Sequence, residues 1–165
     1  MSIFYVTFET PLGRVIAAAE KDRVIALAFT DGRYAPVPVP DWTERPDDPL
    51  LDSVVRQIGE YLSGKRRCFT FPVSLAGTPF QMRVWGALQE IPYGKTVSYR
   101  EVTRFAGLDD RFIRPVASAI ARNTVMLAIP CHRVIGSDGT LVGYAGGLNR
   151  KKALLDMERT TLGKP

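Results

Sequence analysis

The spacing of apolar residues predicts strands and one helix in the first half of the chain. Two segments, Ile3 to Thr7 and Val24 to Phe29, are rich in β-branched and aromatic residues and are followed by turn-forming residues. Between residues 51 and 62 apolar side chains recur at helical spacing, which predicts a helix of about three turns ending near Gly64. Apolar residues then alternate from Phe69 to Leu75, as they do in a strand. The pattern therefore predicts a small sheet with a helix packed on it.

A helical pattern begins where this alternation ends. Thr78 is a suitable N-cap, and Pro79 suits the first position of a helix because proline lacks the N–H that such a position leaves unbonded. The stripe of apolar residues that follows indicates packing in a core and consists of Phe80, Val84, Trp85, Leu88 and Ile91.

Two further short helices around a turn are predicted between residues 98 and 122. Ser98 can cap the first helix, Gly107 can end it, and either Asp109 or Asp110 can cap the second. Pro115 then falls in the first turn of the second helix, where a missing N–H costs little. This spacing fits a helix-turn-helix, and it fits a plain helical hairpin equally well.

The composition is that of an ordinary globular protein, with 165 residues of which 45% are hydrophobic. No apolar run is long enough to span a membrane and the N-terminus lacks the basic region of a signal peptide, so we expect a soluble, cytoplasmic protein with no membrane partner. The net charge of +5 is unevenly distributed, because residues 1–78 carry 9 Lys and Arg against 10 Asp and Glu, whereas residues 79–165 carry 13 against 7. The second half would therefore attract a polyanion.

The candidate chemistry lies in the segment Pro130-Cys131-His132-Arg133-Val134, which contains the one histidine of the chain. A thiol is a good nucleophile as thiolate, and His132 or Arg133 could supply the base or positive charge that favours this form. Cysteine is also often buried as an inert small hydrophobe. Neighbouring residues on an extended segment point to opposite faces, so His132 would serve Cys131 through a turn or a bridging water.

A metal site is not expected from the sequence. Cys68 lies far from Cys131 along the chain, and no CxxC or HxxxH pair completes a set of four ligands. We therefore expect neither a structural metal nor a cofactor, and we expect Cys68 to be an ordinary half-exposed thiol.

A series of spaced motifs in the second half resembles the O6-alkylguanine-DNA alkyltransferases, also called methylated-DNA–protein-cysteine methyltransferases. The resemblance is strong over about the C-terminal half and covers only the general layout of the N-terminal half. The motifs that carry it are Gly77-Thr78-Pro79-Phe80-Gln81, Val84-Trp85, Ile91 to Thr96, Ser98-Tyr99, Arg114, Asn123, Ile129 to Gly136, Gly143-Tyr144, Gly146-Gly147 and Asn149-Arg150-Lys151.

The resemblance implies a mixed α/β (α+β) fold with two domains. Residues 1–78 would form an RNase H-like domain with a three-stranded antiparallel sheet. Residues 79–165 would form a mostly helical domain that contains the helix-turn-helix, binds DNA and carries out alkyl transfer.

The implied activity is DNA repair in a single turnover. Cys131 would irreversibly accept the alkyl group, usually methyl, from O6-alkylguanine in DNA and, less well, from O4-alkylthymine. His132 would act as general base through a water and Glu158 would orient it, while Tyr99 would donate a hydrogen bond to guanine N3.

The implied partner is double-stranded DNA, whose minor groove would receive the second helix while the alkylated guanine is flipped out. Arg114 would fill the gap left by the flipped base, and the protein would act as a monomer that can cluster on DNA. The remaining residues implied in DNA binding are Ala117, Ser118, Ala121 and Arg122. Those implied in the substrate pocket are Asn123, Met126, Val134, Tyr144, Ala145 and Gly146.

The chain departs from the family pattern at a few positions, and other functions compete with repair. Pro115 and Ala117 stand where the family commonly has alanine and glycine, and Thr124 replaces a proline, which leaves DNA docking and the preferred lesion size open. A binding protein that flags damage without repairing it is disfavoured by Cys131. A helix-turn-helix regulator is disfavoured because no separate effector domain is evident. A thiol hydrolase is a third alternative.

Overall fold

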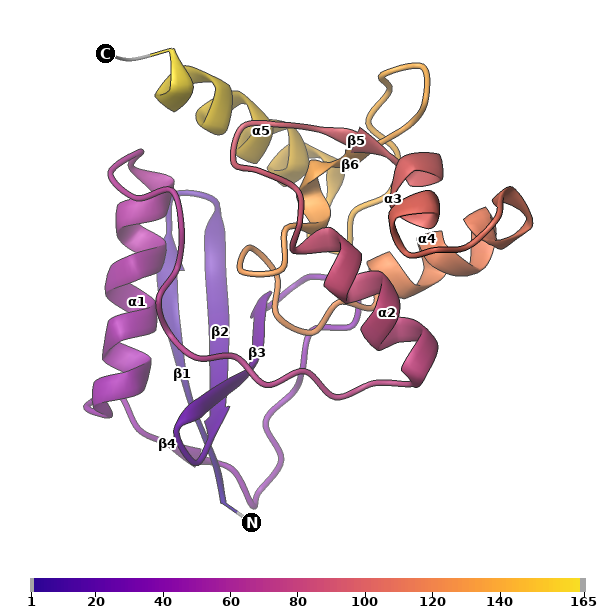
Figure 1. Cartoon of the computed structure of the whole chain (residues 1–165). Helices are drawn as coiled ribbons and strands as arrows, with labels where there is room; N and C mark the ends of the chain where they lie inside the picture. The colour runs from indigo at the N-terminus through magenta and orange to yellow at the C-terminus, as the bar shows by residue number, and fades with distance from the viewer. Residues whose placement is uncertain (1, 164–165) are drawn as a thin grey trace. The chain divides into compact units, whose positions relative to one another are not determined.

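A four-stranded sheet with one helix against it forms from the first half of the chain in the computed structural model, which describes residues 2–163 (Figure 1). The strand order is β3-β2-β1-β4, with β1, β2 and β3 joined antiparallel and the two-residue β4 added parallel to β1. The predicted antiparallel sheet is confirmed, and β4 is an addition that the pattern did not predict. The elements are β1 (Ile3–Thr10), β2 (Gly13–Glu20), β3 (Arg23–Phe29), β4 (Thr43–Glu44) and α1 (Pro49–Leu62).

The central strand β2 was not evident from the sequence. Its residues from Val15 to Ala19 are all buried, so the alternation of apolar and polar residues that marks a half-buried strand is missing. Three of them are alanines, which have a low intrinsic preference for strands. Pairing on both edges, to β1 and to β3, stabilises this segment as a strand.

The predicted helix after residue 50 is confirmed as α1. The Asp48 carboxylate accepts a hydrogen bond from the Leu51 N–H at 3.1 Å, and Pro49 occupies the first turn, so the N-terminus is well capped. Leu51, Val54 and Ile58 are fully buried and form the face of α1 that packs on the sheet.

The strand predicted from Phe69 to Leu75 is wrong. Only Val73 forms a bridge, to Val24, where the Val24 N–H donates to the Pro72 carbonyl and the Ser74 N–H donates to the Val24 carbonyl, both at 2.9 Å. Pro72 has no N–H to contribute to a ladder, which limits further pairing. The alternating aromatic side chains instead form a cluster, in which Phe69 lies 5.1 Å from Tyr61 and 5.3 Å from Phe71 between ring centres.

The second half of the chain is mostly helical. Thr78 and Ser98 cap α2 and α3 with reciprocal capping boxes, and Gly107 follows α3 with a positive φ of 77°, as predicted for these ends. Helices α2, α3 and α4 pack against one another, and the Trp85 indole donates to the Ala119 carbonyl at 2.9 Å. The elements are α2 (Pro79–Leu88), β5 (Val97–Ser98), α3 (Tyr99–Phe105), the 3-10 turn η1 (Asp110–Phe112), α4 (Ile113–Ala121), the 3-10 turn η2 (Cys131–Arg133), β6 (Val134–Ile135) and α5 (Leu148–Leu162).

Contacts divide the chain into two units. Unit 1 comprises the chain up to Leu75 together with Thr124–Ala128, and unit 2 comprises Ala76–Asn123 together with the chain from Ile129 onward. The short segment joins unit 1 because Leu27 exchanges hydrogen bonds with it, donating to the Thr124 carbonyl and accepting from the Met126 N–H, both at 2.9 Å. The predicted domains, residues 1–78 and 79–165, are divided at one point of the sequence and do not include the contribution of Thr124–Ala128 to unit 1. Within residues 2–163, no helix is long and apolar enough to cross a membrane.

Candidate functional site: a buried thiol in an apolar pocket

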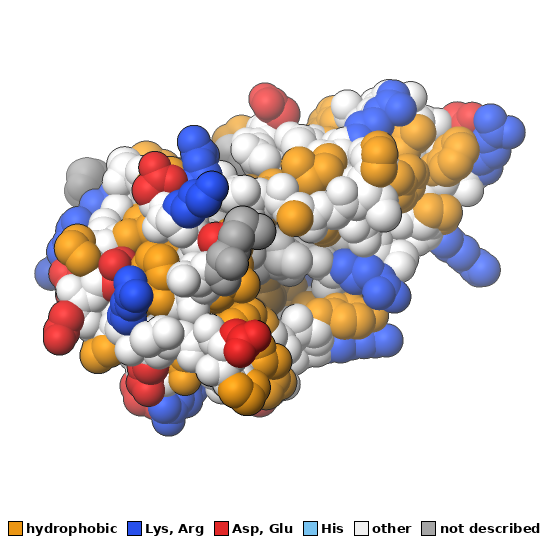
Figure 2. All heavy atoms as spheres, turned by 90° about the horizontal axis from the view of Figure 1, so that it is seen from below, with side chains coloured by type: hydrophobic (Ala, Val, Ile, Leu, Met, Phe, Trp, Pro, Cys, Tyr) orange, Lys and Arg blue, Asp and Glu red, His pale blue; other side chains and the backbone are white. Residues whose placement is uncertain are grey.

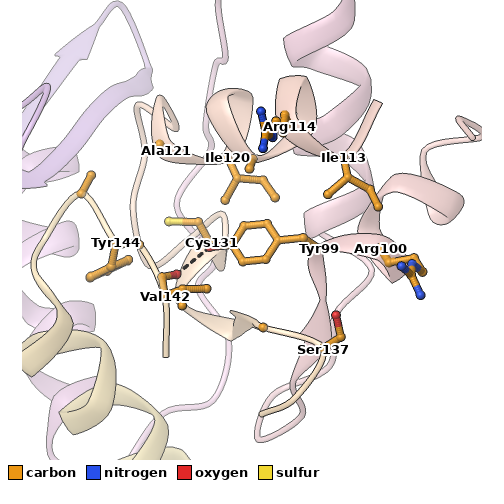
Figure 3. Close-up of a pocket in the computed structure, with 14 residues that line it drawn as sticks. Tyr99, Arg100, Ile113, Arg114, Ile120, Ala121, Cys131, Ser137, Val142 and Tyr144 are labelled. Atoms are coloured by element: carbon orange, nitrogen blue, oxygen red, sulfur yellow. Dashed lines mark hydrogen bonds between the residues drawn. The ribbon is translucent and has the colours of Figure 1, made fainter. Parts of the chain in front are cut away.

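Unit 2 contains a pocket of about 510 Å³ whose lining includes the Cys131 thiol. In Figure 3 the Cys131 sulfur and the Tyr99 ring lie beneath α4, and Tyr144 approaches from the loop that precedes α5. The pocket is largely apolar. Its lining residues are Tyr99, Arg100, Ile113, Arg114, Ala117, Ile120, Ala121, Cys131, Gly136, Ser137, Val142, Gly143, Tyr144 and Ala145.

Cys131 opens the 3-10 turn η2 and is 5% exposed. Burial raises the pKa of its thiol to about 11, although a hydrogen bond with Asn123 and the charge of Lys151 act in the opposite direction. The Asn123 amide also donates to the Ile129 carbonyl at 2.8 Å, so it connects the end of α4 to the segment that leads into the thiol. The resting thiol is therefore protonated at neutral pH and needs a base in order to react.

His132 and Glu158 form a buried pair behind the thiol. His132 Nε2 lies 2.8 Å from Glu158 Oε2, and both side chains have no exposed surface. Burial lowers the pKa of His132, so the imidazole is neutral at pH 7. Burial alone would raise the pKa of Glu158, but hydrogen bonds from His132 and Arg133 hold it well below its usual value. An ionised carboxylate can only accept, so Nε2 carries the imidazole proton and Nδ1 is the basic nitrogen.

Arg133 pairs with Glu158, whereas the sequence analysis considered it as a source of positive charge for the thiol. Its Nε and one terminal nitrogen each lie 3.0 Å from a Glu158 oxygen, and its other terminal nitrogen donates to the Ile91 carbonyl at 2.9 Å. The Gly94 N–H donates to the same carboxylate at 3.0 Å. The local 3-10 turn explains this arrangement, since consecutive residues of a turn need not alternate between two faces as they do in a strand.

Lys151 is a further residue of the site that the sequence analysis did not assign. It is fully buried on α5, and its ammonium donates to the carbonyls of Val142 at 3.2 Å and Gly143 at 2.9 Å. Burial lowers its pKa to about 8, while the nearby Cys131 acts in the opposite direction. Lys151 precedes Glu158 by seven residues, two helical turns, so a search for polar residues on the buried face of α5 could have found both.

The residues predicted to bind DNA lie on or just after α4, and they differ in exposure. Arg114 is exposed and borders the pocket, which Ala117 and Ala121 also line, whereas Ser118 and Arg122 are exposed and lie outside it.

The start of α4 differs from the prediction that Asp109 or Asp110 caps it. Asp109 caps the preceding 3-10 turn by accepting from the Arg111 N–H at 3.1 Å, and α4 itself begins after Phe112 without a side-chain cap. The inserted turn explains the difference. Pro115 lies in the first turn of α4, as predicted.

The residues predicted for the substrate pocket are only partly brought together. Tyr144 and Ala145 line the pocket, and burial raises the pKa of the Tyr144 hydroxyl well above its usual value. Gly146 and Asn123 are buried outside its lining. Val134 is also buried and pairs with Val97 in the sheet β5-β6. Met126 is buried, belongs to unit 1 and is not among the residues that line the pocket.

Arginine side chains are frequent on α3, η1 and α4, but most of them have acidic neighbours. Arg100 and Arg104 lie 3.4 and 3.3 Å from the Asp110 carboxylate, and Arg111 lies 3.1 Å from Asp109. Arg114 has no carboxylate partner among residues 2–163. Figure 2 shows one face of the molecule, on which Lys and Arg side chains are scattered among apolar, uncharged and acidic side chains.

Two further expectations concern Cys68 and a metal site. Cys68 is exposed. In the part of the chain that the structure describes, no three or more His, Cys, Asp or Glu side chains are grouped so that they could hold a metal ion.

Comparisons with known proteins match both halves of the chain. The family model described as "6-O-methylguanine DNA methyltransferase, ribonuclease-like domain" matches residues 3–75, and "6-O-methylguanine DNA methyltransferase, DNA binding domain" matches residues 79–160. The constitutive methylated-DNA–protein-cysteine methyltransferase of Bacillus subtilis is 40% identical over 163 residues, which cover 94% of this chain and 95% of the relative. The corresponding protein of Mycolicibacterium paratuberculosis is 40% identical over 157 residues, covering 95% and 93%.

Solved structures agree with these relatives. The crystal structure of Mycobacterium tuberculosis OGT in complex with DNA matches with a TM-score of 0.88 and 36% identity, covering 96% of this chain and 94% of that one. An O6-methylguanine-DNA methyltransferase from Pyrococcus kodakaraensis, at 20% identity and a TM-score of 0.53, shares the fold.

Proposed function

Because the chain belongs to the 6-O-methylguanine DNA methyltransferase family, we propose that it repairs O6-alkylguanine in double-stranded DNA by transferring the alkyl group to Cys131. The observation that carries the proposal is a buried thiol at an apolar pocket, next in sequence to a histidine that is hydrogen-bonded to a buried glutamate. Alkyl transfer needs a nucleophile that can approach the alkyl carbon and a base that takes the thiol proton.

The first step is removal of the thiol proton. Because the pKa of Cys131 is about 11, the base has to act as the substrate binds. Neutral His132 accepts the proton at Nδ1 through one water. Its Nε2–H remains hydrogen-bonded to the ionised Glu158 carboxylate, which stabilises the imidazolium that forms. Arg133 and Gly94 hold this carboxylate in place.

The second step is displacement at the alkyl carbon. The Cys131 thiolate forms the S–C bond as the C–O6 bond breaks, and the electron pair of that bond passes to the purine. Tyr99, whose pKa is raised by burial and by the nearby Cys131, keeps its proton and donates a hydrogen bond to guanine N3 as negative charge develops. The proton lost by the thiol is returned to the guanine. No group at the site reverses the thioether, so one chain repairs one lesion.

Access to the base requires that the alkylated guanine leave the stack. We place α4 in the minor groove because Ala117 and Ala121 are small and allow close approach of the backbone. In addition, Arg114 at the pocket border has no carboxylate partner within the described part of the chain. The Arg114 side chain takes the space of the flipped base. We infer that the protein acts as a monomer, with several copies able to bind along one DNA.

The proposal is tested by counting repaired lesions against protein molecules. Duplex DNA with one O6-methylguanine is incubated with increasing protein, and the guanine restored is measured after nuclease digestion. We expect a linear titration that ends at one lesion per chain, and no repair by Cys131→Ser, whose hydroxyl has a much higher pKa. Repeated turnover, or repair by Cys131→Ser equal to that of the wild type, would overturn the proposal. DNA binding without any repair would identify a damage-binding protein instead.

A further inference from the structure

One carbonyl oxygen at the pocket edge accepts hydrogen bonds from two side chains. The Tyr99 hydroxyl donates to the Val142 carbonyl at 2.7 Å, the bond drawn as a dashed line in Figure 3. The Lys151 ammonium donates to the same oxygen at 3.2 Å and to the Gly143 carbonyl at 2.9 Å. Side chains from α3 and α5 therefore meet on one peptide of the loop that lines the pocket.

Lys151 occupies a fully buried position, which is unusual for a lysine. It has no exposed surface, and no carboxylate pairs with it among residues 2–163. Its nitrogen lies 5.9 Å from the centre of the Tyr99 ring, and its charge also acts on the Cys131 thiol and on His132. Burying an ammonium group without a counter-charge is costly, and an apolar side chain of similar length would avoid this cost. The cost points to a use for its N–H donors.

The bond between Tyr99 and Val142 competes with the proposed reaction. The single Tyr99 hydroxyl proton cannot be donated to Val142 and to guanine N3 at the same time. When the base binds, Tyr99 has to release the Val142 carbonyl, which then loses one of its two side-chain donors. Lys151 already donates to that oxygen, so the carbonyl keeps one partner after the release.

We propose that Lys151 is a positioning residue that holds the Val142 carbonyl while Tyr99 transfers its hydroxyl hydrogen bond to the extruded base. This inference rests on the proposed function. Lys151 thereby also fixes the peptide between Val142 and Gly143, so that the pocket edge keeps its shape when its second donor leaves.

A double-mutant cycle tests the inference. The rate of methyl transfer from O6-methylguanine duplex is measured for the wild type, Tyr99→Phe, Lys151→Met and the double variant. In the wild type, Tyr99→Phe removes a useful donor and slows transfer. In the Lys151→Met background the Tyr99 hydroxyl stays bonded to the Val142 carbonyl, so Tyr99→Phe should slow transfer less than it does in the wild type. The two slowing factors should differ by about fivefold or more. Lys151→Arg keeps N–H donors at this position and should restore much of the full effect of Tyr99→Phe.

Independent roles give a different result. If Lys151 acts only by its charge on the thiol, the two substitutions slow transfer by factors that multiply, and the inference is wrong. Circular dichroism checks that each variant folds, and if Lys151→Met does not, Lys151→Leu, which also lacks a donor, takes its place in the cycle and the same multiplication overturns the inference. Failure of the wild type to alkylate Cys131 would instead overturn the proposed function, which keeps the two failures distinct.

Discussion

Replacing Glu158 with glutamine tests the buried network behind the thiol. Glu158 is fully buried and accepts hydrogen bonds from His132, from two nitrogens of Arg133 and from the Gly94 N–H. Glutamine preserves the shape, but it removes the negative charge and turns one acceptor oxygen into an NH₂ group that faces donors. Arg133 then remains buried without its counter-charge.

The expected loss is large for a single isosteric change. Breaking a buried ion pair by removing one partner costs about 3–5 kcal/mol. For a protein of this size each kcal/mol corresponds to about 2–4 °C in the melting temperature, so a decrease of about 6–20 °C is expected. At pH 7 the carboxylate is ionised in the folded and the unfolded state, so the measurement contains the whole contribution of the charge. That contribution is lost only as the pH falls through and below the unfolded pKa of about 4.3.

The assay is urea unfolding followed by tryptophan fluorescence in a Trp42→Phe background, in which Trp85 reports on unit 2. Asp156→Asn is the matched control, because this residue lies on the same helix but its ion pairs with Lys152 and Arg159 are exposed, and it should change stability little. Adding Arg133→Met to Glu158→Gln removes the uncompensated charge and should recover much of the loss. A loss below about 1 kcal/mol for Glu158→Gln, or no recovery in the double variant, would refute the reasoning.

Three further predictions concern DNA and the thiols. Arg114→Ala should slow repair in duplex DNA by about tenfold for each 1.4 kcal/mol of unstacking cost no longer offset, yet hardly change reaction with free O6-benzylguanine, and equal slowing of both substrates would disprove a flipping role. Binding to undamaged duplex should weaken with salt by a log-log slope of about 0.9 per phosphate contact, and Arg122→Ala should reduce this slope while Lys21→Ala leaves it unchanged. Iodoacetamide should label exposed Cys68 well before Cys131, whose rate should increase about tenfold per pH unit up to about pH 9.5 because its pKa is about 11; peptide mass spectrometry follows both sites.

Local signals in the sequence were enough to predict several elements. The caps Thr78 and Ser98, and Gly107 after α3, were predictable because capping depends on a few consecutive residues. Strand β2 was not, because its stability comes from pairing on both edges, and its alanines carry no strand preference of their own.

The candidate site shows the same division between local and distant information. The thiol and histidine at positions 131 and 132 were evident because they are adjacent in sequence. The partner of the histidine, Glu158, lies 26 residues away, and spacing alone would have assigned it to an exposed helix face. The resemblance to a family supplied that pairing. Lys151 was missed because a buried lysine contradicts the usual preference of this residue for water.

The central claim is that Cys131 itself receives the alkyl group, and the most direct measurement is to locate that group on the chain. The protein is incubated with excess duplex containing O6-methylguanine that is isotopically labelled in the methyl group, and its intact mass and peptide map are then recorded. The account predicts one methyl group per chain, on the peptide that contains Cys131, with no further increase at longer times. Labelling of Cys68, more than one methyl group per chain, or repaired DNA with an unmodified protein would contradict it.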